Sequence, residues 1–285
     1  MPFVTYCDSV TPEHARVGWL TDDVVMPLRD AKPSNSLKHL LHQTEGDLSV
    51  LVPDERQWIP LEAVRFRPVI ERPGKIFCIG LNYHAHRIET GNQERDHPTV
   101  FARFADCLVG HNEAVWRPKV SQKMDFEGEL AVIIGRSGRH VAVEDAMQLV
   151  AGYSAFNDIS IRDWQRHTTQ FTPGKNFERT GAFGPALVTT AELPDPTALT
   201  LTTRLNGETM QHTTTDLMIF SIPELIAYVT TFTRLAPGDV IVTGTPGGVG
   251  VKREPPIFMK AGDVVEVDIT DVGCLRSHVV DEPEA

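Results

Sequence analysis

The sequence predicts a β-rich α+β protein. Many short runs of β-branched and apolar residues are bounded by glycine, proline, asparagine or aspartate, a pattern typical of strands joined by turns. Few stretches show the apolar spacing of a helix, and they do not alternate with the strands, so βαβ units are not expected. The 285 residues, 41% of them hydrophobic, suffice for one large domain or for a main domain with a smaller companion.

The first part of the chain is predicted to form a small β unit of its own. Val17–Leu28 contains two short apolar strands around a Thr-Asp-Asp turn, as in a hairpin, and Ser34–Gln43 is a candidate helix. Glu71–Gly74 then breaks the pattern with proline and glycine. We therefore expect a small N-terminal domain over residues 1–71 and a larger domain over residues 72–285.

Several strands are expected in the larger domain. Lys75–Ile79, Glu127–Ile134 and Gly152–Asp158 are apolar runs of strand length. Leu199–His212 reads as a hairpin, because Asn206-Gly207 at its centre supplies the two positive φ angles of a type I′ turn. Two further segments each begin with a Gly-Asp turn and continue as a β-branched run: Pro237–Val242 and Ala261–Val267.

Two helices are expected in this domain. Glu144–Val150 is a short candidate. Ser221 and Glu224 form a capping box, in which each side chain satisfies a free N–H group at a helix start. Apolar residues then recur at helical spacing, so one face of this helix should pack on a core: Leu225, Ile226, Val229 and Phe232.

Composition narrows the class of partner and the compartment. The net charge is −11, which argues against nucleic acid and anionic membranes as partners, because both attract clustered Lys and Arg. No apolar run approaches the roughly 20 residues of a spanning helix, and the first residues lack the pattern of an export signal. The four cysteines are widely separated, so a reduced cytoplasmic protein without structural zinc is expected.

Three acids form the strongest chemical signal. Glu127 and Glu129 are two apart on a predicted strand and therefore project from one face, just where the sequence becomes apolar. Two buried carboxylates repel each other, and a divalent cation would compensate them, although two solvated glutamates at a strand edge remain an alternative. Asp158 ends another apolar run. An all-oxygen triad with open positions suits catalytic Mg²⁺ or Mn²⁺, or Ca²⁺, better than Zn²⁺.

A His–Glu pair is the second candidate. His86 and Glu89 are three apart, so one helical turn would place the carboxylate on the imidazole and leave the other ring nitrogen as a base toward water. A surface ion pair is the alternative. His84 and His86 could instead bind a metal together on a strand, but the polar, loop-like surroundings argue against this alternative.

Other polar residues could bind an anionic substrate. Arg162 and Gln165 follow Asp158 by about one turn, and Lys175 lies in a nearby loop. The glycine-rich Thr243–Gly250 is no dinucleotide or P-loop motif. Its N–H groups and the Thr245 hydroxyl could hold a carboxylate or an oxyanion. Taken singly, each of these residues could equally be a solvated surface group.

These pieces, in this order, resemble the fumarylacetoacetate hydrolase family. The resemblance runs from about Lys75 to the C-terminus and rests on six blocks: Gly80-Leu-Asn-Tyr83 with His86 and Glu89, Phe126–Gly135, Asn157-Asp158 with Arg162–Gln165, Lys175, Phe220–Pro223 and Thr243–Gly250. It implies a mixed β-sandwich roll with a small N-terminal β domain. No acid lies in Ile79–Tyr83, where the founding animal enzyme has a fourth ligand, so the chain is similar to the smaller bacterial and mitochondrial relatives of the acylpyruvase kind.

The resemblance also implies roles for site residues. One Mg²⁺ or Mn²⁺ per subunit would be held by Glu127, Glu129 and Asp158. His86 and Glu89, on a lid, would activate water, and Lys175 would be the third catalytic residue, stabilising an oxyanion. The resemblance implies substrate contacts for five further residues: Tyr83, Arg162, Gln165, Gly244 and Thr245.

From these roles the expected activity is hydrolysis of a C–C bond. An acylpyruvate, or 2,4-dioxo acid, would be cleaved to pyruvate and a carboxylic acid through a metal-stabilised enolate. Oxaloacetate decarboxylation and 2-hydroxyhepta-2,4-diene-1,7-dioate isomerisation are alternatives on the same scaffold, and a non-catalytic metal-dependent diacid binder is one of another class. A homodimer is expected. For the substrate tail, Phe104, Trp164 and Phe171 are candidate pocket walls, and Arg103 either meets a distal carboxylate or is a solvated strand residue.

Overall fold

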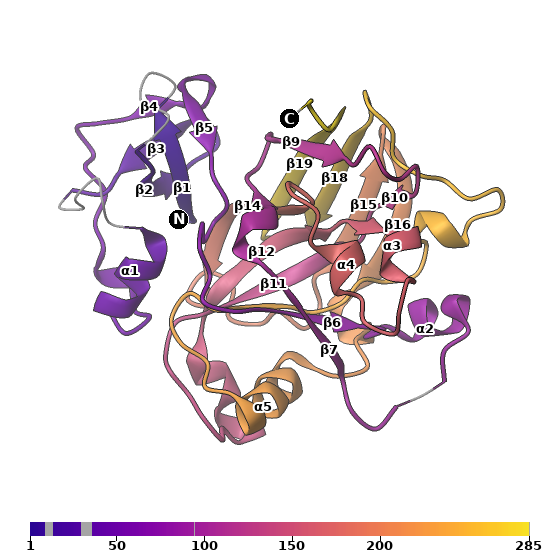
Figure 1. The fold of residues 1–285 in the computed structure, drawn as a ribbon. Helices are drawn as coiled ribbons and strands as arrows, with labels where there is room; N and C mark the ends of the chain where they lie inside the picture. Colours follow the sequence, from indigo (N-terminus) through magenta and orange to yellow (C-terminus); the bar gives the residue numbers. More distant parts are fainter. Residues whose placement is uncertain (9–13, 30–35, 94, 285) are drawn as a thin grey trace.

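The computed structural model describes residues 1–8, 14–29, 36–93 and 95–284, and three sheets organise them (Figure 1). Twelve strands form the largest sheet: β1 Phe3–Asp8, β2 Arg16–Leu20, β3 Val24–Pro27, β4 Ile59–Pro60, β5 Val64–Phe66, β6 Ile76–Gly80, β7 Thr99–Arg103, β8 Leu108–Val109, β11 Gly128–Ile134, β12 Val150–Asp158, β14 Gly181–Thr189 and β17 Val240–Val242. They form one mixed twelve-stranded sheet in the order β4-β3-β2-β1-β14-β12-β11-β17-β6-β7, with β5 beside β1 and β8 beside β14.

The other two sheets are smaller. The five-stranded sheet has the order β16-β15-β18-β19-β9, from β9 Ala114–Arg117, β15 Thr200–Leu205, β16 Glu208–Thr214, β18 Val264–Ile269 and β19 Gly273–Asp281. The two-stranded sheet pairs β10 Met124–Asp125 with β13 Ser160–Ile161. The predicted β-rich α+β class and the mixed sandwich roll are confirmed.

The helices are few and short. The α-helices are α1 Leu37–Gln43, α2 His84–Thr90, α3 Arg162–Gln165, α4 Thr172–Lys175 and α5 Ile222–Phe232. The 3-10 helices are η1 Leu48–Val50, η2 Leu61–Ala63, η3 Ala105–Cys107, η4 Val143–Leu149, η5 Thr215–Leu217 and η6 Gly250–Lys252. Within the described part of the chain, no helix is both long enough and apolar enough to cross a membrane.

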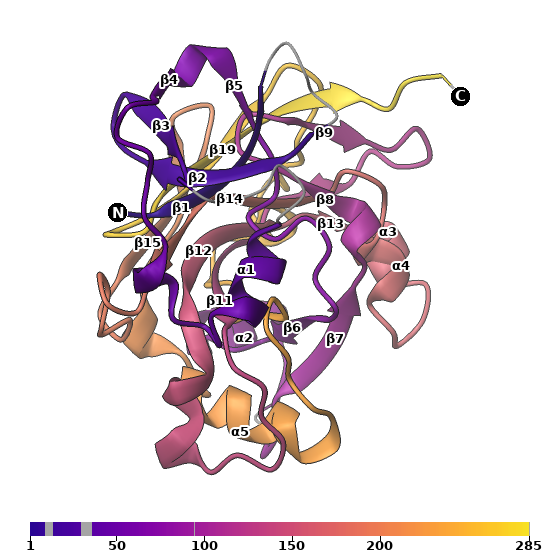
Figure 2. The same ribbon diagram turned by 90° about the vertical axis from the view of Figure 1, so that its left-hand side faces the viewer.

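Both faces of the central strand β11 are buried, which explains its unbroken apolar run. Leu130 and Val132 point into the core shared with the five-stranded sheet, where they join Leu201 of β15. Ala131 and Ile133 point to the opposite face and pack in the cluster that contains α1. Figure 2 shows the sheets turned by 90°, with α1 on this second face. The start of β11 is therefore held rigidly from both sides.

The turn and helix chemistry follows the sequence closely. Asn206 and Gly207 have φ angles of 53° and 83°, as a type I′ turn between β15 and β16 requires. Helix α5 begins at the predicted capping box, in which the Ser221 N–H donates to Glu224 at 2.7 Å. The hairpin predicted over Val17–Leu28 is also present as β2 and β3.

Two helical predictions need adjustment. The segment predicted as a helix over Glu144–Val150 is a 3-10 helix, because the Leu149 carbonyl accepts N–H bonds from the neighbouring strand end and the chain enters β12 at once. Helix α1 begins after Ser36, whose side chain accepts from the His39 N–H, and the predicted start at Ser34 lies outside the described residues. The domain boundary at 71/72 stays a prediction, and β1 of the N-terminal part pairs with β14 of the large sheet.

His111 makes folding sensitive to acid. Its ring packs edge-on against the Phe66 ring, with 5.0 Å between the ring centres. Its Nδ1 accepts a hydrogen bond from the backbone N–H of Arg276 at 3.2 Å. Burial and the nearby Arg276 and His278 lower its pKa to about 4. The unfolded chain has a pKa near 6.5 at this residue and binds more protons between these two values. This contribution to stability is therefore complete above about pH 6.5 and is lost as the pH falls toward 4.

A His111→Gln variant should lose that dependence, because glutamine keeps an acceptor but does not titrate. We expect the free energy of unfolding of the wild type to fall by up to about 1.4 kcal/mol more per pH unit than that of the variant across this window. Urea unfolding at pH 4.5, 5.5, 6.5 and 7.5 measures this difference in the free energy of unfolding. His84→Gln, at an exposed histidine, is the control. Identical pH profiles for wild type and His111→Gln would contradict the assignment.

Candidate metal and catalytic site

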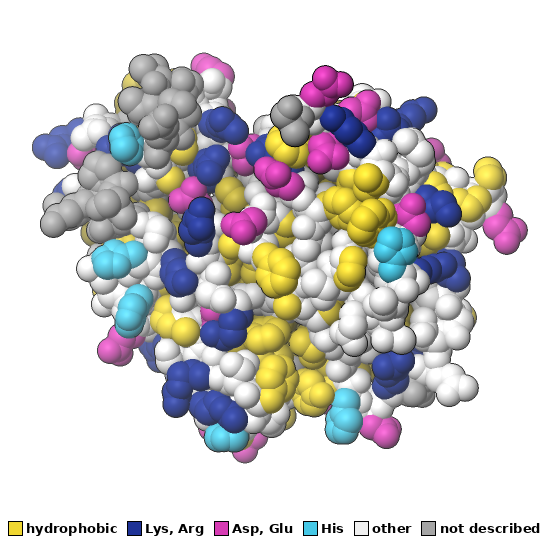
Figure 3. Space-filling view, in the orientation of Figure 1, with side chains coloured by type: hydrophobic (Ala, Val, Ile, Leu, Met, Phe, Trp, Pro, Cys, Tyr) yellow, Lys and Arg dark blue, Asp and Glu magenta, His cyan; other side chains and the backbone are white. Residues whose placement is uncertain are grey.

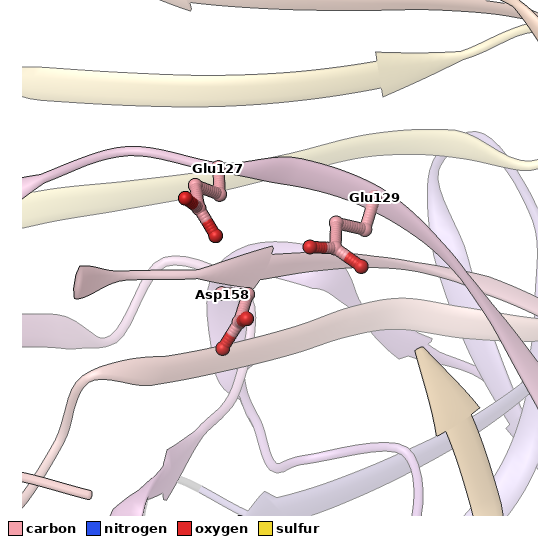
Figure 4. A group of neighbouring side chains, drawn as sticks. All are labelled: Glu127, Glu129 and Asp158. Atoms are coloured by element: carbon pink, nitrogen blue, oxygen red, sulfur yellow. The ribbon is translucent and has the colours of Figure 1, made fainter. Parts of the chain in front are cut away.

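The three predicted acids converge in space. Glu127 immediately precedes β11, Glu129 is its second residue, and Asp158 ends the antiparallel neighbour β12. One carboxylate oxygen from each lies within 4.8 Å of the others, and all three residues are buried. Figure 4 shows the two glutamates projecting from one strand toward the aspartate on the next. The alternative of a solvated strand edge is therefore excluded.

Gly128, between the two glutamates, permits close packing at this point. A Cβ on this residue would lie 2.1 Å from the Thr203 Oγ1 and 3.2 Å from the Val267 side chain. Both neighbours belong to the five-stranded sheet, so the glycine lets the two sheets approach just where the acids project.

Three cations contact the triad. The Lys175 Nζ lies 2.5 Å from Glu127 Oε2 and 2.5 Å from Asp158 Oδ2. The Arg162 Nη1 lies 2.7 Å from Glu127 Oε1. Arg103 pairs with Asp158. Glu129 has no ion pair among the described residues, and its Oε2 accepts the Gly244 N–H at 2.5 Å.

This unequal pairing shifts the pKa values of the two glutamates in opposite directions. Burial disfavours ionisation of Glu127, but Arg162 and Lys175 outweigh it and hold its pKa at about 2. Burial, together with the charges of Asp158 and Glu127, raises the pKa of Glu129 well above its ordinary value. Glu129 is thus the acid for which the protein itself supplies too little positive charge.

The His86–Glu89 pair forms as predicted. Both residues lie on α2, and His86 Nδ1 lies 2.7 Å from Glu89 Oε1. The second Glu89 oxygen accepts the Gly248 N–H at 2.9 Å, so the glutamate joins the helix to the glycine-rich segment. A carboxylate on Nδ1 favours a proton there and leaves Nε2 as the basic nitrogen.

The glycine-rich segment mostly serves the protein's own carboxylates. The N–H groups of Gly244, Gly248 and Gly250 donate to Glu129, Glu89 and Asp125. Those three N–H groups therefore hold carboxylates, one of the two roles that the sequence allowed, but these carboxylates belong to the protein itself. The substrate contact expected of Gly244 stays a prediction.

Thr245 is also fixed by the protein. Its hydroxyl donates to the Gly128 carbonyl at 3.0 Å and accepts from the Gln211 Nε2 at 2.8 Å. The side chain still lines the catalytic cavity described below. Sequence reasoning missed Gln211, whose polar contacts span distant segments.

One cavity of about 110 Å³ unites the candidate residues. Of the predicted site residues, seven line it: His86, Glu127, Glu129, Arg162, Gln165, Lys175 and Thr245. Asp158 lies beneath, fully buried against Lys175. Tyr83 is buried outside the lining, and Gly244 is committed to Glu129. Of the candidate pocket walls, Phe171 is part of the lining, whereas Phe104 and Trp164 are not.

Arg103 corrects a sequence expectation. It neither meets a distal carboxylate nor lies in solvent, because its side chain is fully buried. It pairs with Asp158 and donates to the Thr180 Oγ1 at 2.8 Å and the Cys107 Sγ at 3.3 Å. Its function in the structure is to fix the deepest acid of the triad.

Asp125 is a second residue whose importance the sequence did not reveal. It is fully buried and accepts from Arg162 Nε at 2.7 Å, from Gly250 N–H at 2.8 Å and from Val251 N–H at 3.0 Å. It therefore orients the arginine that contacts Glu127 and clamps the end of the glycine-rich segment.

The residues present fit a hard divalent cation. The donors are carboxylate oxygens, they converge from two adjacent strands, and one of them has no cation of its own. Such a donor set suits Mg²⁺ or Mn²⁺. His86, Glu127 and Glu129 face one cavity, and Asp158 lies directly beneath it. Together with the mixed β-sandwich roll, this site defines the class: an enzyme with an all-carboxylate metal site and an adjacent base.

The comparisons with known proteins identify the family. The chain belongs to the fumarylacetoacetate hydrolase family: the model described as fumarylacetoacetate (FAA) hydrolase C-terminal matches residues 75–280. The chain is 40% identical to the mitochondrial oxaloacetate tautomerase FAHD2A of Bos taurus over 250 residues, which cover 86% of this chain and 80% of the relative.

Two solved structures of this fold carry different activities in their names. The 2-hydroxyhepta-2,4-diene-1,7-dioate isomerase of Mycobacterium marinum has a TM-score of 0.79 and 27% identity and covers all of both chains. The maleylpyruvate hydrolase of a Sphingobium species, solved with manganese(II) and pyruvate, has a TM-score of 0.80 and 27% identity and covers 99% of this chain and 100% of that one. The family thus includes isomerases and hydrolases.

Proposed function

We propose that this protein is a divalent-metal-dependent tautomerase of a small 2-oxo dicarboxylic acid such as oxaloacetate. The 40% identity to an oxaloacetate tautomerase supports the reaction. The cavity of about 110 Å³ supports a compact substrate, since sites for drug-sized ligands measure roughly 300–1,000 Å³. This proposal moves away from the predicted C–C hydrolysis toward an isomerase-type reaction, one of the kinds the sequence left open.

The observation that carries the proposal is that the His86 base and the acids Glu127 and Glu129 face one cavity. Enol–keto interconversion needs a base at the carbon next to the carbonyl and positive charge at the 2-oxo oxygen. His86 supplies the base in this cavity, and a cation held by the acids would supply the positive charge.

In the proposed mechanism His86 Nε2 moves a proton between C3 and the 2-oxygen. Removal of the C3 proton forms the C2–C3 double bond and places the carbonyl electron pair on the 2-oxygen, which then receives the proton. Glu89 keeps Nδ1 protonated and stabilises the imidazolium that forms transiently. A divalent cation held by Glu127, Glu129 and Asp158 would supply the Lewis-acid charge that acidifies a proton beside a 2-oxo group.

Arg162 and Lys175 hold the pKa of Glu127 at about 2 and so keep this acid ionised. Lys175 also extends over the face of Phe101, with its Nζ 5.1 Å from the ring centre, which fixes its long side chain. Arg162 retains a buried Nη2 with no hydrogen-bond partner in the described structure, so it offers a donor to a substrate carboxylate.

Hydrolysis of an acylpyruvate is the second candidate. The same His86 Nε2 could take a proton from water instead of carbon, and the neighbour named maleylpyruvate hydrolase was solved with manganese(II) and pyruvate. In that case a C–C bond breaks, and pyruvate and a carboxylic acid are released.

Product analysis separates these reactions. With oxaloacetate and Mg²⁺ or Mn²⁺, we expect a faster loss of the enol's ultraviolet absorbance without pyruvate or CO₂ release. Pyruvate with CO₂ would instead indicate decarboxylation, and pyruvate with a labelled acid from an acylpyruvate in ¹⁸O-water would indicate hydrolysis. Ligand binding without any turnover would favour the diacid-binding alternative. The same assay with each metal decides between Mg²⁺ and Mn²⁺.

We further propose a homodimer. Figure 3 shows hydrophobic side chains gathered over β7 and α5, and β7 is the edge of the large sheet. Phe232 there is 52% exposed and stacks edge-on against Phe77 at 5.9 Å. A second copy that covers this apolar face would explain its exposure. Light scattering tests the dimer, and fractionation of the source cells tests the cytoplasmic location.

A further inference from the structure

We propose that Arg166 selects dicarboxylic substrates by binding the carboxylate at the end away from the metal. Arg166 lines the catalytic cavity and is exposed at its mouth. Its side chain makes no ion pair or hydrogen bond among the residues that the structure describes. It differs in this from every other Lys or Arg of the cavity lining.

The inner cations are already committed. Lys175 bridges Glu127 and Asp158, and Arg162 pairs with Asp125 and Glu127. Arg103, the residue that the sequence offered for a distal carboxylate, is buried on Asp158. Within the described lining, Arg166 is therefore the cation whose whole guanidinium group stays available to a ligand.

The spacing along α3 suits a short diacid. Arg162 and Arg166 are four residues apart, with Arg166 as the residue that caps the helix. Side chains at this spacing lie on one helix face, with about 6 Å between their Cβ atoms. Arg162 contacts Glu127 of the triad, so Arg166 lies about one helical turn farther out. A four-carbon diacid anchored beside the triad would extend its second carboxylate along the same line.

Charge balance favours the same assignment. Four acids and three cations form the triad and its ion pairs: Asp125, Glu127, Glu129 and Asp158, with Arg103, Arg162 and Lys175. With all four acids ionised around one divalent cation, this group would carry a single net positive charge. It would compensate only one of the two charges of a dianionic ligand, and the Arg166 guanidinium can pair bidentately with the second carboxylate.

The test compares two inert ligands of the same size and hydroxylation. Malate and 2-hydroxybutanoate differ in having a distal carboxylate or a methyl group, and neither tautomerises. With saturating Mg²⁺, calorimetry should show that the wild type binds malate more tightly than 2-hydroxybutanoate. Arg166→Gln should weaken the binding of malate by about tenfold, within the range for a charge-assisted hydrogen bond at an exposed residue. Binding of 2-hydroxybutanoate should not change.

Three comparisons make the result specific. Arg166→Lys should restore part of the malate preference, and Arg276→Gln, the same charge change on β19 outside the cavity, should leave it intact. Higher ionic strength should reduce the preference of the wild type. An unchanged malate-to-hydroxybutanoate ratio in Arg166→Gln, or an equal loss for both ligands, would overturn the inference.

The inference rests on the proposed function only for the ligand class. A wild type that binds malate through Arg166 but does not accelerate oxaloacetate tautomerisation would contradict the proposed reaction and leave the carboxylate site supported. A wild type that accelerates the reaction while Arg166→Gln keeps its ligand ratio would support the reaction and contradict the carboxylate site.

Discussion

Replacement of His86 by alanine is expected to slow oxaloacetate tautomerisation by about 10²–10⁴-fold, the usual contribution of a positioned general base. The imidazole is the cavity's only histidine among the lining residues that the structure describes, and its Nδ1 is held by Glu89 at 2.7 Å. Steady-state rates measured by loss of enol absorbance, at saturating Mg²⁺ or Mn²⁺, give the change in kcat. Metal affinity should be retained, because His86 is not one of the triad.

His84→Ala is the matched control for this prediction. It removes a second imidazole from the same helix, but His84 is exposed and does not line the cavity. We expect its rate to remain within about threefold of the wild type. Equal rates for wild type and His86→Ala would remove His86 from the mechanism, and equal losses in both variants would point to damage of α2 instead.

Replacement of Arg103 by leucine is expected to cost about 3–5 kcal/mol of unfolding free energy, because it removes one of the two cations that pair with the buried Asp158 carboxylate and leaves Lys175 alone to compensate it. Both side chains of the Arg103–Asp158 pair are fully buried. The guanidinium also satisfies Thr180 and contacts Cys107. Urea unfolding of metal-free protein in the presence of EDTA measures the loss without the compensation that a bound cation would give Asp158.

The Arg204–Asp268 pair supplies the control for burial. Its nitrogen and oxygen lie 3.1 Å apart, but the two side chains are 34% and 42% exposed. Arg204→Leu should change stability by no more than about 1 kcal/mol, as is usual for surface pairs. A loss of similar size in Arg103→Leu would show that Asp158 does not depend on its arginine.

The metal triad could be predicted because its signal is local. Glu127 and Glu129 share a face through the two-residue period of a strand, and Asp158 ends the next apolar run. The pairing of His86 with Glu89 could be predicted for a similar reason, because residues three apart meet on one helical turn. The turn at Asn206 and the capping box at Ser221 likewise depend only on neighbours in the chain.

Residues whose partners are distant in the sequence could not be assigned in this way. Arg103 sits in an ordinary strand sequence, and its partner Asp158 is 55 residues away. Asp125 receives N–H groups from a segment 125 residues further along, which no local pattern reveals. The free state of Arg166 is likewise visible only once the neighbouring arginines are seen to be paired. Charge pairing across the fold, not local spacing, decides these roles.

The central claim is that Glu127, Glu129 and Asp158 bind one divalent cation beside the catalytic base. Mn²⁺ titration followed by electron paramagnetic resonance tests it most directly, with Glu127→Gln, Glu129→Gln and Asp158→Asn each compared with wild type and with Glu266→Gln, a control on β18 outside the cavity. We predict one Mn²⁺ per chain in the wild type and in the control, and at least about tenfold weaker binding in each triad variant. Full Mn²⁺ affinity in the triad variants, or no bound Mn²⁺ in the wild type, would contradict the claim.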